Sequence, residues 1–595
     1  MNRSLALLGV TGAAALLGGC AASSGPPLPE KFEQRSPVLG GHNGPPVDQG
    51  QTGTARFVNP LLDDFDTEAA ISIATFLDGF YRAPGNDGYE ESVERVIAAL
   101  YGGGFGASSG FDLSVARPSL GPGWNPVSAR ISAVAGERAV AEAAKRGVKP
   151  RAGSARVVEF MGFENPSDRN RVMLPVGAPS CDLQGSIAVG LTEVEPGRVL
   201  LTDRPLKAVQ REAVEGGAVA IVSDYILPYC VDPTGDKRDY DAVFCDEVDP
   251  MEAIPSFQVS PRLGAALRNA SKVGTQLKLE AKVRVEARPL RTIFATIEGA
   301  ERPEEVVFIL AHIDGAGAND NAAGAGGVAE LALAMKRQIE AGELARPRRS
   351  LCFVFGTEQG AGAAAMEETD GQPVAAIVAD MIAADATKTG AMCLLERGWD
   401  PANLFLLPPD EHTPWDGGEE AVGEIVPQGL SIICREALID VSYAEAARGK
   451  GSWTTGEHPW EGGGDHDVFL SRGVAAALIW HFTDFTFHTS LDRMDMVDPA
   501  ELRRTAVAIG AAALAVADAQ PMDLERHLDT LNLERRARLD AVVRAEAGPE
   551  AEQLWKDWFR GARFWLKALT AGEPLAPAQP LRVETAPTTG GEAEG

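Results

Sequence analysis

Residues 304–324 read EEVVFILAHIDGAGANDNAAG, and this stretch decides how the middle of the chain folds. An apolar run of strand length ends at His312, and a helical pattern follows over residues 322–341. The loop between them carries His312, Asp314 and Asp320 within nine residues and is otherwise rich in Gly, Ala and Asn. Packing does not explain such a loop, and its small residues allow the backbone to approach something small.

Apolar strands and helices continue to alternate after this loop. SLCFVF, VAAIVADM and VAAALIW read as strands, and residues 499–517 read as a helix. Fully apolar strands imply a sheet that is covered on both faces, with its chemistry at the carboxyl ends of the strands. We therefore expect residues 286–520 to form an α/β domain.

Acidic or imidazole side chains follow each of these strands. Glu358 comes just after the second strand, Asp380 ends the third, and His488 follows the last by a few residues. Carboxylates and imidazoles that converge from several strands are the ligands zinc prefers, and no nucleophile elbow suggests a serine triad instead. One aspartate can bridge two ions about 3.5–4 Å apart, and Asp320 is the natural bridge.

Five motifs now stand in order: His-x-Asp, Gly-Ala-Asn-Asp-Asn-Ala-Ala-Gly, a strand-end Glu, Asp-Met-Ile, and His-Thr-Ser-Leu-Asp. Together they resemble metallopeptidase family twenty-eight, the co-catalytic zinc aminopeptidase and glutamate carboxypeptidase family, over roughly residues 60–518. The resemblance implies a zinc-exopeptidase-like mixed sheet flanked by helices. It also implies hydrolysis of peptide bonds by a metal-activated water, with two Zn²⁺ ions per chain.

Carried over position by position, the resemblance makes His312, Asp320 and Asp380 ligands of one zinc. Asp320 would bridge to the second zinc, to which His488 belongs, and Asp314 would orient His312. The peptide bond after the bridging aspartate is often cis in this family. Four of the eight histidines lie between residues 458 and 488, and we expect only His488 of these to bind metal, while the others line the pocket or make hydrogen bonds.

The chain departs from the family pattern after the second strand, where most members have two adjacent glutamates. Here only Glu358 is present, followed by Gln359. In the alignment we prefer, Glu358 is the general base and Gln359 takes the ligand place. In the other, Glu358 is the ligand and Thr357 stands where the base should be. A Gln carbonyl is a weaker zinc ligand than a carboxylate, so we expect the second site to be weakly filled.

Other segments surround the predicted peptidase core. Residues 59–149 contain two helical patterns and are expected to be its N-terminal part. Residues 150–285 show short β-type runs and resemble a protease-associated domain, which would either cover the cleft or dock a partner. Residues 521–570 read as C-terminal helices, and residues 571–595 as a disordered tail.

The first twenty residues resemble a bacterial lipoprotein signal that ends in Leu-Gly-Gly-Cys, with Cys20 as the lipid-bearing residue. Ordinary signal cleavage with an incidental Cys20 is the alternative. Residues 21–58 would form a flexible linker. We expect a lipid-anchored protein, in the outer membrane facing the periplasm if the source is Gram-negative.

The charge balance and the cysteines restrict the partners and the chemistry. The chain has 84 acidic residues against 55 Lys and Arg, a formal charge of -29, so nucleic acid and anionic lipid headgroups are not expected partners. Cys230 and Cys245 are the closest cysteine pair and a plausible disulfide. Cys352 lies in an apolar strand pattern and reads as a buried thiol.

The leading hypothesis is a zinc-dependent exopeptidase, aminopeptidase-like, with peptides as substrates and an oligomeric state that the sequence does not reveal. Two rivals remain. One is a one-zinc acyl transferase resembling glutaminyl cyclase. The other is a catalytically worn binding protein on the same fold, a possibility raised by the missing glutamate.

Overall fold

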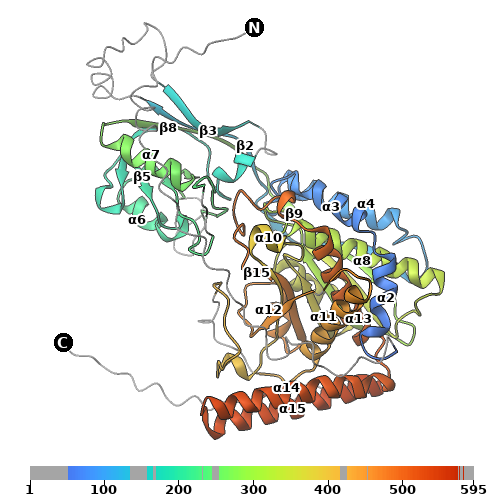
Figure 1. Cartoon of the computed structure of the whole chain (residues 1–595). Helices are drawn as coiled ribbons and strands as arrows, with labels where there is room; N and C mark the ends of the chain where they lie inside the picture. The colour runs from blue at the N-terminus through green and yellow to red at the C-terminus, as the bar shows by residue number, and fades with distance from the viewer. Residues whose placement is uncertain are drawn as a thin grey trace.

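The computed structural model describes residues 51–134, 157–164, 169–230, 232, 234–243, 253–415, 425–451, 453–573, 575 and 580–581. It has two lobes, each built on its own β-sheet, and a pair of long C-terminal helices along one side of the larger lobe (Figure 1). No helix in these described ranges is both long enough and apolar enough to span a bilayer.

The larger lobe contains an eight-stranded mixed sheet, which confirms the predicted α/β class. Four of its strands run parallel, so their carboxyl ends meet at one edge. In spatial order the strands are β1 (Phe111–Gly121), β9 (Arg288–Ile297), β11 (Arg349–Gly356), β10 (Arg302–His312), β12 (Gln372–Ala379), β15 (Ala475–Phe482), β13 (Met392–Glu396) and β14 (Thr455–His458).

Helices cover both faces of this sheet. One face packs in a single apolar core with α2 (Ala55–Asp64), α3 (Thr67–Asp78), α4 (Asp87–Gly102), α8 (Ala322–Ala341), α11 (Leu430–Ala447) and α13 (Pro499–Ala517). The other face packs against the short helices α9 (Gly360–Glu368) and α12 (His466–Leu470). A further short helix, α10 (Ala386–Thr389), follows β12.

Local capping explains why α8 and α13 begin where the sequence predicts. The Asn321 side chain accepts a hydrogen bond from Gly324 N (3.1 Å), and Gly342 ends α8 with φ of 75°. Asp498 caps α13, whose first residue is Pro499. The loop that precedes α8 is thereby fixed at both ends, by β10 and by the cap.

The second lobe contains a seven-stranded sheet, β3 (Val157–Phe163), β2 (Trp124–Val134), β8 (Gln276–Val285), β4 (Cys181–Val189), β5 (Val199–Thr202), β6 (Ala220–Ser223) and β7 (Ser256–Gln258). Two helices accompany it, α6 (Gln210–Glu215) and α7 (Pro261–Ser271). Its sheet starts at Trp124, before the boundary expected at residue 150. The chain crosses between the lobes at the turn after β1, where a Cβ on Gly123 would lie 2.0 Å from Glu286 O. Only glycine allows the outgoing and returning strands to pass this closely.

The C-terminal helices α14 (Leu524–Arg544) and α15 (Gly548–Ala571) lie side by side against the larger lobe (Figure 1). A buried group of charges ties them to it: Arg538 of α14 donates to Glu457 of β14 (3.0 Å) and to Asp410. Cys352 is buried as expected, with a pKa raised to about 12 by desolvation. The expected disulfide between Cys230 and Cys245 is wrong, because Cys230 is a free, buried thiol whose Sγ donates to Phe487 O (3.4 Å).

Candidate metal centre

The loop between β10 and α8 is held in shape by a buried arginine. Arg82 donates to Ile313 O (2.7 Å) and to Gly317 O (2.7 Å), and its own backbone pairs with Gly315. A loop without regular structure keeps one conformation when its carbonyl groups are satisfied in this way. The side chains at its two ends, His312 and Asp320, are therefore placed by backbone contacts rather than by packing.

Three of the predicted ligands meet above the edge of the sheet. His312 Nε2 lies 3.3 Å from Asp320 Oδ1 and 3.3 Å from Asp380 Oδ1. One ligand atom from each of these residues lies within 4.8 Å of the other two, a spacing that a single cation can fill. The three side chains are contributed by β10, by the following loop and by the end of β12.

The fourth predicted ligand lies on the opposite side of Asp320. His488 Nε2 is 3.0 Å from Asp320 Oδ2, whereas His312 faces Oδ1. The two oxygens of one carboxylate thus face two different imidazoles, which is the arrangement of a bridging ligand between two ions. The donor set of carboxylates and imidazoles fits zinc.

Electrostatics at the centre favour bound cations. Burial alone would raise the pKa of Asp320, but hydrogen bonds from His312 and His488 hold this pKa well below its ordinary value. Burial would likewise lower the pKa of His312, yet the charge of Asp380 and hydrogen bonds to the other carboxylates raise it well above 6.5. The centre holds more carboxylates than its imidazoles can neutralise, so a divalent cation would be strongly attracted.

Asp314 contacts His312, as the resemblance implies, and also the backbone of Glu358. Its Oδ1 lies 3.3 Å from His312 Nδ1 and accepts a hydrogen bond from Glu358 N (2.9 Å). A carboxylate on Nδ1 leaves Nε2 as the metal-facing nitrogen. Asp314 therefore orients the His312 ring and fixes the start of the turn that carries Glu358.

Glu358 lies at the centre but outside the group of three close ligand atoms. Glu358 is exposed to solvent at the mouth of the site, yet nearby protein atoms desolvate its carboxyl group. This desolvation and the charges of Asp380 and Asp314 raise the pKa of Glu358 well above its ordinary value, although His312 opposes them. Gln359 is also exposed, with φ of 57°. The role of Glu358 as base, which the preferred alignment predicts, stays a prediction.

Sequence reasoning missed the carboxylates that support Asp320 from behind. The buried Asp492 accepts hydrogen bonds from Asn319 N (2.8 Å) and Asp320 N (3.0 Å), and Asp484 accepts one from the Asn319 amide (3.1 Å). Asp492 was visible as the last residue of the His-Thr-Ser-Leu-Asp motif, but nothing in the sequence indicated its partner. The Asp320–Asn321 peptide is cis, as the resemblance implies.

A second group of metal-capable side chains lies at the carboxyl ends of β13 and β14 and consists of Glu396, His458 and Glu461. Here Trp480 Nε1 donates to His458 Nε2 (2.9 Å), and His458 Nδ1 lies 2.8 Å from Pro459 O. An indole N–H can only donate, so the Nε2 lone pair of His458 is already occupied. This histidine makes hydrogen bonds, as expected, and the group is a poorer cation site than the one around Asp320.

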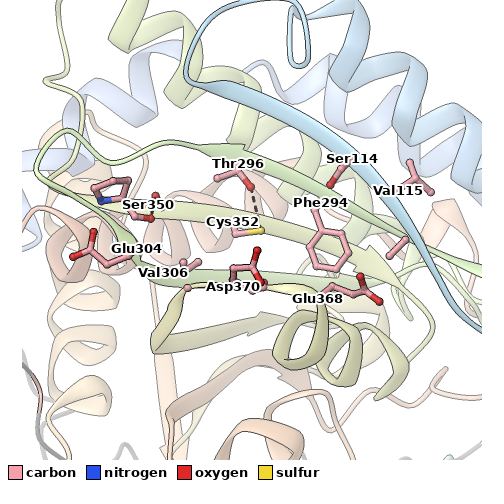
Figure 2. Close-up of a pocket in the computed structure, with 14 residues that line it drawn as sticks. Ser114, Val115, Phe294, Thr296, Glu304, Val306, Ser350, Cys352, Glu368 and Asp370 are labelled. Atoms are coloured by element: carbon pink, nitrogen blue, oxygen red, sulfur yellow. Dashed lines mark hydrogen bonds between the residues drawn. The ribbon is translucent and has the colours of Figure 1, made fainter.

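A groove of about 540 Å³ opens on the same sheet, away from the metal centre (Figure 2). Phe294, Val306 and Cys352 line it together with the acidic residues Glu368 and Asp370. Its strand residues come from β1, from β9 and from the first halves of β10 and β11, whereas the metal centre lies at the carboxyl end of β10. None of the predicted site residues lines this groove.

Residues 292–390 match the model of Peptidase family M28. Over this segment the chain is similar to peptidase family M28, the family that its sequence motifs resemble. The matched segment contains the β10 loop, Glu358 and Asp380, that is, most of the centre described above. No curated protein matches the chain in sequence.

One solved structure supports the same fold for this chain, and two others are similar to it at lower scores. The Peptidase M28 precursor from Shewanella amazonensis SB2B is 17% identical, with a TM-score of 0.50 over 78% of this chain and 97% of its own. An aminopeptidase from Aneurinibacillus sp. strain AM-1 is 15% identical, with a TM-score of 0.45 over 77% of this chain and 96% of its own. A zinc aminopeptidase from Bacillus subtilis is 13% identical, with a TM-score of 0.46 over 75% and 94%.

Proposed function

We propose that this protein is a zinc-dependent exopeptidase of the aminopeptidase type. The observation that carries the proposal is the placement of Asp320, whose Oδ1 faces His312 and whose Oδ2 faces His488 at 3.0 Å. A one-ion site has no need of a carboxylate shared between two imidazoles. The first ion would be held by His312, Asp320 and Asp380, and the second by Asp320 and His488.

Zinc held by these residues would supply an activated water and would polarise the scissile carbonyl group. Glu358 would act as the general base, holding the proton released in the attack and passing it to the leaving amine. Asp314 keeps both His312 and the Glu358 backbone in register during these transfers. The desolvated position of Glu358 matches a group that must both take up and release a proton.

Glu358→Gln tests this assignment, because it keeps the shape of the side chain and removes the base. We expect peptide hydrolysis to fall by about 10²–10⁴-fold while two zinc ions per chain remain bound. Glu367→Gln, on the exposed part of α9, is the matched control and should keep full activity. Loss of one zinc in Glu358→Gln would instead make Glu358 a ligand, and undiminished hydrolysis would refute both roles.

The glutaminyl-cyclase-like alternative predicts one zinc per chain and cyclisation of peptides with an N-terminal Gln. Elemental analysis together with mass spectrometry of the products separates it from hydrolysis. The worn binding protein predicts no turnover of any peptide. The close contacts of all four ligands argue against that alternative, because a receptor without catalysis would not require them.

We also propose, from sequence alone, that Cys20 carries a lipid and that the mature chain is anchored to the outer membrane facing the periplasm. Residues 1–50 lie outside the described residues, so support comes only from the Leu-Gly-Gly-Cys ending. Cys20→Ala should leave the protein in the soluble fraction after export. The segment of residues 150–285, called the insert below, is likewise proposed from its sequence alone to be a protease-associated domain.

A further inference from the structure

The insert reaches the metal centre at two places. On one side, Arg171 donates to Ala316 O (3.1 Å) in the β10 loop and to Asp78 O (3.0 Å). On the other side, residues 238–240 run antiparallel to the loop that carries His488. The insert thus contacts both loops from which the imidazoles of the centre emerge.

The contact with the His488 loop is made by backbone hydrogen bonds. Tyr240 N donates to His488 O (2.6 Å), and Ser490 N donates to Arg238 O (2.8 Å). His488 itself has φ of 50°, a left-handed conformation that is uncommon for a residue with a side chain. A conformation of this kind persists only when surrounding contacts enforce it, and two of those contacts come from the insert.

Two aromatic rings then fix the His488 imidazole. Phe487 stacks on it with centroids 3.8 Å apart, and Tyr240 meets it edge to face at 5.6 Å and 79°. Tyr240 is held in turn by Tyr81, at 5.7 Å and 62°. His488 Nε2 faces Asp320 Oδ2. The Tyr240 ring packs against the imidazole and so restricts rotation of the His488 side chain away from Asp320.

The Tyr240 hydroxyl remains available for another partner. No residue in the described part of the chain forms a hydrogen bond with it. The Tyr240 ring lies beside the His488 imidazole, with ring centroids 5.6 Å apart, so its hydroxyl belongs to a side chain that contacts the metal centre. A tyrosine hydroxyl can donate a hydrogen bond.

We propose that Tyr240, supplied by the insert, completes the metal centre in two ways. Its ring positions His488, and its hydroxyl donates a hydrogen bond to the substrate carbonyl oxygen as negative charge develops there. The second role rests on the proposed peptidase function, whereas the first does not. The insert thus contributes a functional side chain to the site.

Two substitutions separate these roles. Tyr240→Phe keeps the ring and removes the hydroxyl, so zinc content and zinc affinity should not change while kcat falls by about 10²–10³-fold and KM stays similar. Tyr240→Ala removes the ring as well, so the affinity for the weaker zinc should fall by about 10–100-fold. Zinc affinity is measured by competition with a chromophoric chelator, on the whole chain without its signal segment.

Tyr229→Phe is the matched control. Tyr229 lies in the same part of the insert, and its ring contacts Phe482, the last residue of β15, at 5.4 Å. Its hydroxyl also lacks a partner among the described residues. We expect this variant to keep wild-type kcat and zinc affinity. An equal loss in Tyr229→Phe would show a general effect of altering the insert and would overturn the specific role of Tyr240.

Other outcomes also decide the matter. Wild-type kcat in Tyr240→Phe overturns the hydroxyl role, and wild-type zinc affinity in Tyr240→Ala overturns the positioning role. If Tyr240→Ala does not fold, Tyr240→Leu takes its place in the zinc measurement. If the wild-type chain binds zinc but hydrolyses no peptide, the peptidase function and the hydroxyl role fail together, while the zinc measurement still decides whether Tyr240 positions His488.

Discussion

Asp492→Asn should weaken zinc binding although Asp492 touches no metal ligand atom. The two carboxylate oxygens accept one backbone N–H each, from Asn319 (2.8 Å) and from the bridging Asp320 (3.0 Å), and the side chain is 1% exposed. An asparagine of the same shape offers only one oxygen to these two donors. Its amide group would face the other N–H, donor against donor.

The size of the effect follows from that single unpaired group. A buried N–H without an acceptor costs about 1–3 kcal/mol, which corresponds to about 5- to 150-fold in an equilibrium constant. If the loop relaxes without metal, the whole cost appears as weaker zinc affinity. If it does not relax, the cost appears as a lower free energy of unfolding of the metal-free chain.

Both quantities are measurable on the same preparation. Chelator competition gives the zinc affinity, and urea unfolding of the metal-free chain gives the stability. Asp495→Asn, three residues later and exposed, is the control and should change neither. A variant with unchanged zinc affinity and a free energy of unfolding within about 0.5 kcal/mol of wild type would refute the supporting role of Asp492.

Two further predictions concern a glycine and a buried charge. A Cβ on Gly317 would lie 1.9 Å from Asp492 Oδ2, so Gly317→Ala should reduce the zinc content per chain in elemental analysis. Gly102→Ala is the control, because a Cβ there would have nothing within 4 Å, and it should keep the wild-type zinc content. Equal zinc content in both variants would contradict the predicted clash. Burial alone would raise the pKa of Asp410, but Arg397 and Arg538 lower it from 3.8 to about 2. The resulting stabilisation, about 2 kcal/mol, is present above about pH 4 and is lost as the pH falls toward 2. Thermal unfolding of Asp410→Asn should therefore depend less on pH in that window than wild type, and equal slopes would count against the buried network.

Local signals in the sequence predicted the elements of the larger lobe well. The helices α8 and α13 start at the predicted residues because Asn321 and the Asp498–Pro499 pair fix these positions through their own caps. The meeting of His312, Asp320 and Asp380 was predictable for a related reason. Parallel strands in one sheet bring their carboxyl ends to one edge, so residues far apart in the chain are placed together by a simple rule.

Long-range contacts between the lobes were not predictable in the same way. The strand β2 (Trp124–Val134) joins the second sheet rather than the first, and this depends on the close passage of Gly123 and Glu286. Tyr240 meets His488 across two lobes, and no periodicity or spacing encodes that contact. Such contacts depend on how the surfaces of the two folded lobes pack together, and this packing cannot be derived from a single sequence.

The conformation of His488 bears on whether the missing glutamate has ended catalysis. A left-handed backbone at a residue with a side chain costs of order 1–3 kcal/mol, and here it is accompanied by an imidazole fixed between Phe487 and Tyr240. A scaffold that only binds a partner could relax this residue to an ordinary conformation and gain that energy. In this strained conformation His488 Nε2 lies 3.0 Å from Asp320 Oδ2, which is the placement that a second ion would require. A chain that had lost its second metal would have no physical reason to retain it, and this supports the proposed peptidase over the alternative of a catalytically worn binding protein.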